Sequence, residues 1–236
     1  MIFELVAANL VVFLAAVLQA ATGVGFAMVA VPLLALISLV WVPAPMLICN
    51  IALSVFIMLR GRHEVARAEA PPLVAGLALG TFAGAGILAS FEGQGLGAMI
   101  GAIIVAAVLA SLFTPKLRIT RVRLASAAFI GGATGAIAAM HGPPLIIIYQ
   151  RERPEKVRAT MAGVFVFGCV LAIASLWLAG LFGRGELMRG LVLLPGVALG
   201  FFAGRALGGR MSPGVVRYAM LTLAGTAGLG LLLRSL

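Results

Sequence analysis

The sequence predicts an all-α polytopic membrane protein built from two related halves. Of its 236 residues, 63% are hydrophobic and only 10% are charged, the mean hydropathy is +1.18, and a short motif recurs in the second half. Soluble domains contain about 45–50% apolar and about 25% charged residues. A chain of this length cannot bury so much apolar surface in a core of its own, so most side chains must face lipid.

Charge and cysteine content exclude several other classes. Seventeen Lys and Arg residues stand against seven acidic residues, which gives a net charge of +10. The basic residues form short clusters between apolar segments, as the positive-inside rule describes, so we expect no nucleic-acid partner. Cys49 and Cys169 lie inside apolar segments without a C-x-x-C or Cys/His cluster. We therefore expect neither a disulfide nor a metal site, and no cofactor.

Polar residues divide the chain into apolar segments of the length that membrane helices need, roughly 20 residues for a full span. In order, the segments are Phe3–Leu18, Phe26–Val40, Met46–Leu59, Leu73–Ala89, Leu96–Phe113, Leu124–Tyr149, Ala159–Leu181, Leu187–Leu207 and Val215–Leu233. They are too long and too uniformly apolar for barrel strands, so we expect helices throughout. Met1 to Leu18 has no basic region at its start, so it reads as a retained first span rather than a signal peptide.

The stretch 124–149 decides the topology. If it crosses the membrane once, the basic residues divide ten to seven between the two sides. If it enters and returns as a broken or re-entrant pair, only Arg184, Arg189 and Arg234 lie opposite the other fourteen, which fits a cytoplasmic excess of Lys and Arg. About 26 residues suffice for two half-helices of roughly 13 each. We therefore predict periplasmic termini and cytoplasmic loops at Arg62, Arg121 and Arg153.

An internal repeat supports this topology. At an offset of 112, the motif Ala21-Thr22-Gly23 falls on Ala133-Thr134-Gly135, and seven of the seventeen positions from Leu18 to Leu34 are identical. We predict two inverted-topology repeats, each a broken or re-entrant helix pair followed by three spans, giving about eight membrane helices. The first repeat covers residues 1–114, a basic cytoplasmic linker covers 115–123, and the second repeat covers 124–236. Secondary transporters often have this build, with the substrate at the midplane.

The two Thr-Gly breaks are the predicted binding site. Breaks free backbone N–H groups, and half-helix N-termini carry partial positive charge, so a small anion is the expected ligand. The alternative is that these small residues only let helices pack closely. The candidate substrate-binding residues are Gln19, Thr22, Gly23, Gly25, Asn50, Thr134, Gly135, His141, Gly142, Pro143 and Arg158.

Three of the candidates have open alternatives. His141 is the only ionisable residue well inside an apolar segment, and it could carry a proton or be a structural histidine at a helix end. Arg158 suits bidentate binding of an oxyanion, although anchoring at the membrane surface explains it nearly as well. Asn50, like the other polar side chains near the breaks, could instead bond a neighbouring helix.

Both motifs resemble those of the sulfite exporter TauE/SafE family. The first runs from Leu18 through Thr22-Gly23-Val24-Gly25 to Leu34, and the second runs from Gly131 through His141-Gly142-Pro143-Pro144. The resemblance implies a permease for sulfite, sulfonates or other small organic anions, with about eight transmembrane helices. The first motif often carries a run of glycines in this family, whereas Phe26 and Ala27 follow Gly25 here.

The leading functional hypothesis is therefore a secondary transporter of a small anion, an exporter or permease in the bacterial inner membrane. Its partners would be the anion, the lipid bilayer and, if it assembles, a second copy in a homodimer. No G-x-x-x-x-G-K-[ST] motif is present for ATP. No Asp, G-x-S-x-G or H-x-x-x-H is present, so an enzyme is not expected. A membrane scaffold or assembly factor remains the alternative.

Overall fold

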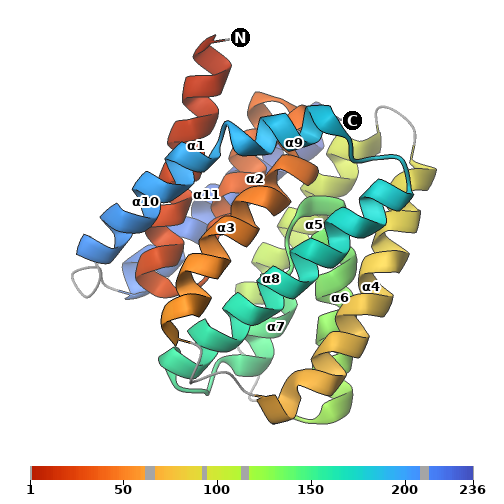
Figure 1. Cartoon of the computed structure of the whole chain (residues 1–236), viewed down its shortest axis with the longest axis vertical. Coiled ribbons are helices and arrows are strands. Elements are labelled where there is room, and N and C mark those ends of the chain that lie inside the picture. Colours follow the sequence, from red (N-terminus) through yellow and green to blue (C-terminus); the bar gives the residue numbers. More distant parts are fainter. Residues whose placement is uncertain (1, 62–66, 92–94, 113–116, 208–212, 236) are drawn as a thin grey trace.

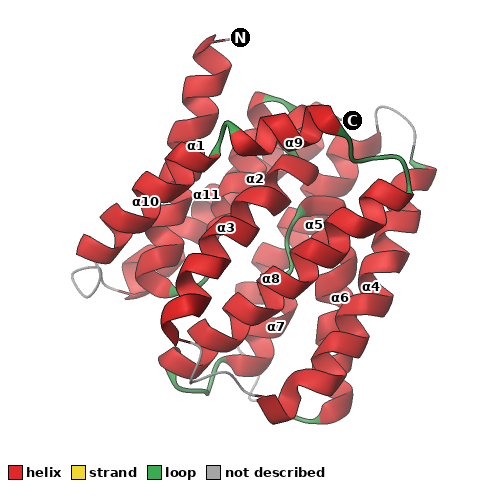
Figure 2. Cartoon of the chain, viewed as in Figure 1, coloured by secondary structure: helices red, strands yellow, loops and turns green. Residues whose placement is uncertain are grey.

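The computed structural model describes residues 2–61, 67–91, 95–112, 117–207 and 213–235. Over these ranges the chain is helical and contains no strand (Figure 2). Six helical segments of the described residues, with Arg184–Leu207 counted as one, are long and apolar enough to cross a membrane, and the apolar helices Phe26–Ile37 and Ala44–Leu59 are shorter. The protein is therefore a multi-pass membrane protein, as the composition predicts. The predicted loop at Arg62 lies outside the described residues.

The helices follow the predicted apolar segments. The first half contains α1 (Ile2–Thr22), α2 (Phe26–Ile37), the 3-10 turn η1 (Leu39–Trp41), α3 (Ala44–Gly61), the 3-10 turn η3 (Arg67–Glu69), α4 (Ala70–Ser90) and α5 (Gly95–Leu112). The second half contains α6 (Arg121–Ala138), α7 (Gly142–Tyr149), α8 (Pro154–Leu178), α9 (Arg184–Leu191), α10 (Leu194–Leu207) and α11 (Pro213–Arg234). Both chain ends lie at one end of the helix bundle, and α7 and the start of α8 lie at the other (Figure 1).

Two predicted segments differ from the structure. The prediction of two half-helices of about 13 residues is wrong, because α6 has 18 residues and α7 has 8. The Thr120 hydroxyl accepts a bond of 3.3 Å from the amide of Arg123, so α6 already starts within the basic stretch. The predicted single segment 187–207 is divided between α9 and α10. Pro195 explains this division, since proline has no N–H and its ring clashes with the carbonyl four residues earlier.

Glycines allow two pairs of helices to approach backbone to backbone. On α4, Gly76, Gly80 and Gly84 face carbonyl groups of α6, and on α10, Gly196, Gly200 and Gly204 face carbonyl groups of α1. A Cβ atom at Gly80 would lie 1.9 Å from the Phe129 oxygen, and one at Gly200 would lie 2.3 Å from the Phe13 oxygen. Small residues at such crossings permit close van der Waals packing without a hydrophobic driving force.

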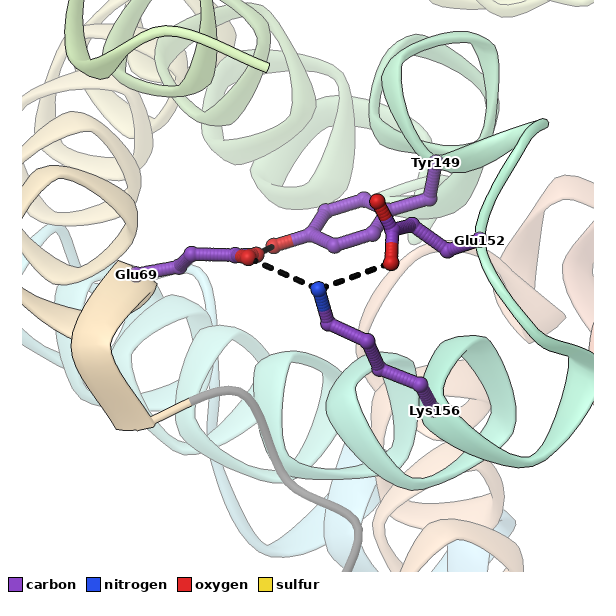
Figure 3. Close-up of polar contacts among 4 residues, drawn as sticks. All are labelled: Glu69, Tyr149, Glu152 and Lys156. Carbon is purple, nitrogen blue, oxygen red and sulfur yellow. Dashed lines mark hydrogen bonds and ion pairs between the residues drawn. The ribbon is translucent and has the colours of Figure 1, made fainter.

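A polar cluster fixes the end of α7 to its neighbours (Figure 3). The Lys156 ammonium lies 2.9 Å from a carboxylate oxygen of Glu69 and 2.9 Å from one of Glu152. The Tyr149 hydroxyl donates to the other oxygen of Glu69. Glu69 precedes α4, Tyr149 ends α7 and Lys156 is in the first turn of α8. The cluster therefore holds three helix ends together at the end of the bundle opposite the termini.

The glycine contacts predict a position-specific effect of adding one methyl group. We expect Gly80→Ala to destabilise the protein by about 1–3 kcal/mol, because the methyl group must push α6 away. Gly86 lies on the exposed face of the same helix with nothing within 4 Å of an added Cβ, so Gly86→Ala is the matched control. Thermal unfolding in detergent measures both variants. Equal melting temperatures for the two would show that α4 and α6 are not in close contact.

Candidate functional site

The first break separates α1 from α2. Gly23 and Gly25 have φ angles of 90° and 110°, which lie in the left-handed region that favours glycine. The side-chain oxygen of Gln19 accepts a bond of 2.9 Å from the Phe26 amide, so it takes up one of the unpaired N–H groups at the start of α2. The Thr22 hydroxyl lies 2.7 Å from the carbonyl oxygens of both Leu18 and Val24. Side chains from α1 thus satisfy the backbone on both sides of the break.

At the second break, between α6 and α7, a threonine hydroxyl again contacts backbone carbonyl oxygens on both sides of the break. The Thr134 hydroxyl lies 2.9 Å from the Ile130 oxygen and 2.7 Å from the Met140 oxygen. Ala139 closes α6 in the left-handed conformation with φ 55°. Pro143 and Pro144 then occupy the first turn of α7, where no N–H donor is needed. Thr22 and Thr134, which the repeat aligns, therefore both stabilise a break by bonding backbone carbonyl groups.

The imidazole of His141 is fully buried between two glycines. A Cβ at Gly135 would lie 2.2 Å from its Nε2 atom, and a Cβ at Gly168 would lie 2.7 Å from its Cδ2 atom. The Nδ1 atom is 3.8 Å from the sulfur of Cys169. Gly135 and Gly168 thus leave the space that the ring fills. Gly168 was not predicted, because nothing in the sequence marks it among the 30 glycines.

The two breaks meet at a cavity of about 20 Å³, here called the central cavity. It is lined by Gln19, Gly25, Ala27, Met28, Asn50, His141, Gly142, Pro143, Ile146 and Phe165. Six of the predicted site residues are thereby brought together from both halves of the chain. The first residues of α2 and of α7 both border the cavity, so two helix N-termini with their partial positive charge meet there. This volume is enough for about one water molecule.

Two residues of the lining each have a buried side-chain nitrogen without a partner. Among the described residues, neither Nε2 of Gln19 nor Nε2 of His141 has a hydrogen-bond partner. Buried polar groups are nearly always paired, because leaving one unpaired costs about 1–3 kcal/mol. An amide nitrogen only donates, and a histidine nitrogen donates in one tautomer or when protonated. The cavity therefore offers hydrogen-bond donors to a bound acceptor.

The remaining predicted residues lie at the breaks but do not line the central cavity. They are Thr22, Gly23, Thr134, Gly135 and Arg158. The Arg158 guanidinium donates a bond of 3.2 Å to the Ala21 oxygen, and its side chain packs over Gly23. A cation at this place is favourable, because the C-terminus of α1 carries partial negative charge. Arg158 thus joins the second half of the chain to the break in the first half.

The family model of the sulfite exporter TauE/SafE matches residues 8–231. The chain belongs to the sulfite exporter TauE/SafE family. The resemblance predicted from the two motifs is confirmed, and this TauE/SafE protein is a member of a family of sulfite and sulfonate permeases. Neither the curated proteins nor the solved structures give a significant match to it.

The contacts of Thr134 predict how the loss of its hydroxyl changes stability. We expect Thr134→Val to lower the stability of this TauE/SafE protein by about 1–2 kcal/mol, because the Met140 carbonyl loses its donor. Thr134→Ser keeps the hydroxyl and should lose less. Thr226, whose hydroxyl bonds the Thr222 oxygen within regular helix at 2.8 Å, supplies the control Thr226→Val. Melting temperatures in detergent compare the three, and equal values for the two valine variants would mean that the hydroxyl does not hold the break.

Proposed function

We propose that this chain is a secondary transporter, an exporter or permease of the bacterial inner membrane, for a small anion such as sulfite or a short organosulfonate. The anion binds in the central cavity, between the two halves. The observation that carries the proposal is the pair of unpartnered buried nitrogens, Nε2 of Gln19 and Nε2 of His141, beside the first turns of α2 and α7. Family membership supports the same class of substrate.

The chemistry of the cavity favours an anion over a cation or a neutral solute. No carboxylate of the described residues lines it. The donors of Gln19 and His141 and the two helix N-termini all place positive potential inside. The rest of the lining, including Met28, Ile146 and Phe165, is apolar, and a low local dielectric strengthens each electrostatic contact. A pyramidal oxyanion such as sulfite presents three oxygen acceptors to the donors of such a site.

The packing of the helices supports the proposal that two inverted repeats, with about eight membrane helices, surround this cavity. If α1 to α5 correspond to α6 to α11, with α9 and α10 together matching α4, the contacts exchange as a two-fold axis requires. Helix α1 packs on α10 as α6 packs on α4, and α2 packs on α11 as α7 packs on α5. Helices α3 and α8 contact each other, as do α5 and α11. A substrate at such an axis is typical of inverted-repeat transporters.

Transport then requires a change of shape. A cavity of about 20 Å³ accommodates one water molecule, so it must widen before it admits an oxyanion such as sulfite. Rocking or gating of one group of helices against another around the central site is the usual mechanism in this architecture. The sequence carries no nucleotide-binding motif, so an ion gradient or the gradient of the anion itself drives the cycle. His141, at the centre, is placed to carry a proton with the anion.

The first test replaces the donor of Gln19 while keeping its acceptor. In Gln19→Glu a carboxylate oxygen still accepts from the Phe26 amide, but the nitrogen is lost and a negative charge is added. We expect this variant to fold and to lose anion binding. Thermal shifts in detergent with sulfite, thiosulfate, short sulfonates and carboxylates measure this, because a ligand that binds only the folded state stabilises it by about 2.7 kcal/mol at 100 times Kd.

Ser175→Ala is the control for this test, since it removes a buried hydroxyl from α8 away from the central cavity. Its thermal shifts should equal those of the parent. If Gln19→Glu without ligand melts like the parent and still shows the full shift with the same anion, the anion does not bind at Gln19. Loss of folding in this variant is resolved with His141→Leu, which removes the other unpartnered nitrogen and should therefore also lose binding.

The second test concerns topology. In a background with Cys49→Ala and Cys169→Ala, single cysteines at Arg121 and Arg153 should react with an impermeant maleimide only after cells are permeabilised. A cysteine at Gly183, between α8 and α9 at the opposite end, should react in intact cells. Labelling of position 153 from outside, with position 121 protected, would contradict the inverted repeats and the re-entrant α6–α7 pair.

A further inference from the structure

A second cavity of about 240 Å³ adjoins the central one, here called the vestibule. The two share Gly25, Met28 and Ile146, so only side chains separate them. The vestibule lies among α2, α7, the last turn of α5 and the first turns of α11. Ser111, Gln150 and Arg217 lie at helix ends that point away from the chain termini (Figure 1). The vestibule therefore approaches the site from the end that carries the basic clusters.

Arg217 gives the vestibule a positive charge. Its side chain is exposed, and its guanidinium donates a hydrogen bond of 2.7 Å to the backbone carbonyl oxygen of Ser111. A guanidinium has five N–H donors in a fixed fork, so the others remain for an oxyanion. Within the described part of the chain no carboxylate forms an ion pair with Arg217. Gln150, whose amide is exposed beside it, adds further donors.

The surrounding charges strengthen this attraction. Among the residues whose side chains the structure describes, the basic ones at this end of the bundle are Arg118, Arg121, Arg123, Arg151, Arg153, Lys156, Arg158, Arg205 and Arg217, and the acidic ones are Glu69, Glu152 and Glu155. Glu69 and Glu152 are both already bonded to Lys156 (Figure 3). Such an excess of one sign raises the local concentration of anions and the rate at which they bind.

Met220 lines the vestibule next to the first break, whose residues Thr22, Val24 and Gly25 also line this cavity. This methionine lies three residues after Arg217 on α11, so both side chains face the same side of the helix. Its methyl carbon occupies the space beside Gly25, where an added Cβ would lie 1.8 Å away. Methionine side chains are flexible, so rotation of Met220 and Met28 can open the passage without moving a helix. The left-handed Gly25 thus makes room for a movable side chain.

We propose that the vestibule is a second anion site, an entry site at which Arg217 and Gln150 hold the transported anion before it passes Met220 to the central cavity. This inference rests on the proposed function, because it names the side from which the anion is taken. It assigns to Arg217 the role of capturing the anion, while Arg158 stays bonded to the end of α1.

The first measurement needs no knowledge of the substrate. Ser111→Cys in the background without other cysteines is treated, in inside-out vesicles, with an anionic methanethiosulfonate that carries a sulfonate and with its cationic trimethylammonium analogue. We expect the anionic reagent to react faster, after correction for its rate with a free thiol. Arg217→Gln should lower that ratio about threefold or more, and added salt should do the same by screening.

The second measurement is uptake of radiolabelled sulfite into the same vesicles. Arg217→Gln should raise the half-saturation concentration about threefold to tenfold, the range for losing one partly exposed charged contact. The maximal rate should change little, and Arg217→Lys should recover part of the affinity. Arg234→Gln is the matched control, because Arg234 also bonds a backbone oxygen, that of Leu36 at 3.4 Å, at the opposite end of the bundle. Melting temperatures confirm that each variant is folded.

The two measurements separate the two proposals. If Arg217→Gln leaves both the reagent ratio and the half-saturation concentration unchanged while sulfite is transported, the entry site is overturned and the proposed function stands. If the ratio falls in Arg217→Gln but none of sulfite, thiosulfate, short sulfonates and carboxylates shifts the melting temperature or is transported, the vestibule attracts anions and the proposed function is overturned. A fall in the ratio together with a raised half-saturation concentration supports both.

Discussion

A helix that breaks in an apolar environment frees backbone N–H and C=O groups, and each of them must find a partner or a ligand. This chain breaks two helices near its centre and satisfies most of the freed groups from one turn away. Thr22 and Thr134 hold the carbonyl side of each break, and Gln19 holds the first amide of α2. Among the described residues, the side-chain nitrogens Nε2 of Gln19 and Nε2 of His141 have no partner, and both residues line the central cavity. The polar interior of this otherwise apolar protein is a consequence of that constraint.

Two pairs of helices around the breaks pack tightly. Helices α4 and α6, and likewise α1 and α10, approach so closely that three glycines of each pair face the carbonyl groups of the partner helix. Interfaces of this kind move as units, since any sliding would press a side chain against backbone. In contrast, methionine and aromatic side chains, Met28, Met220 and Phe165, surround the cavities. Each of these glycine interfaces joins a helix of the first half to a helix of the second, so the conformational change that we propose must occur around the cavities and not within these pairs.

Some basic residues at the basic end of the bundle hold helices together, and we propose that another binds the anion. Lys156 is neutralised by two glutamates and holds the ends of α7, α8 and the segment before α4 together. Arg158 is bonded to the end of α1. Arg217, which differs from both because it is exposed at the mouth of a cavity that leads inward, remains available to a soluble anion. A uniformly basic end of the bundle thus contains residues with different roles, and only their contacts distinguish them.

The sequence alone determined the membrane class, the helical segments, the asymmetry of charge, the family and the position of both breaks. These are local or compositional properties: apolar length sets the spans, and Thr-Gly with proline marks the breaks. Only the tertiary structure decided which break residues meet. Gln19, Asn50 and His141 converge on one cavity whereas Thr22, Thr134 and Arg158 serve the backbone, and Gly168 and Arg217 had no signal in the sequence at all. The reason is that spacing along a helix fixes the direction of a side chain relative to its own helix, while the crossing of helices from the two halves decides what that side chain faces.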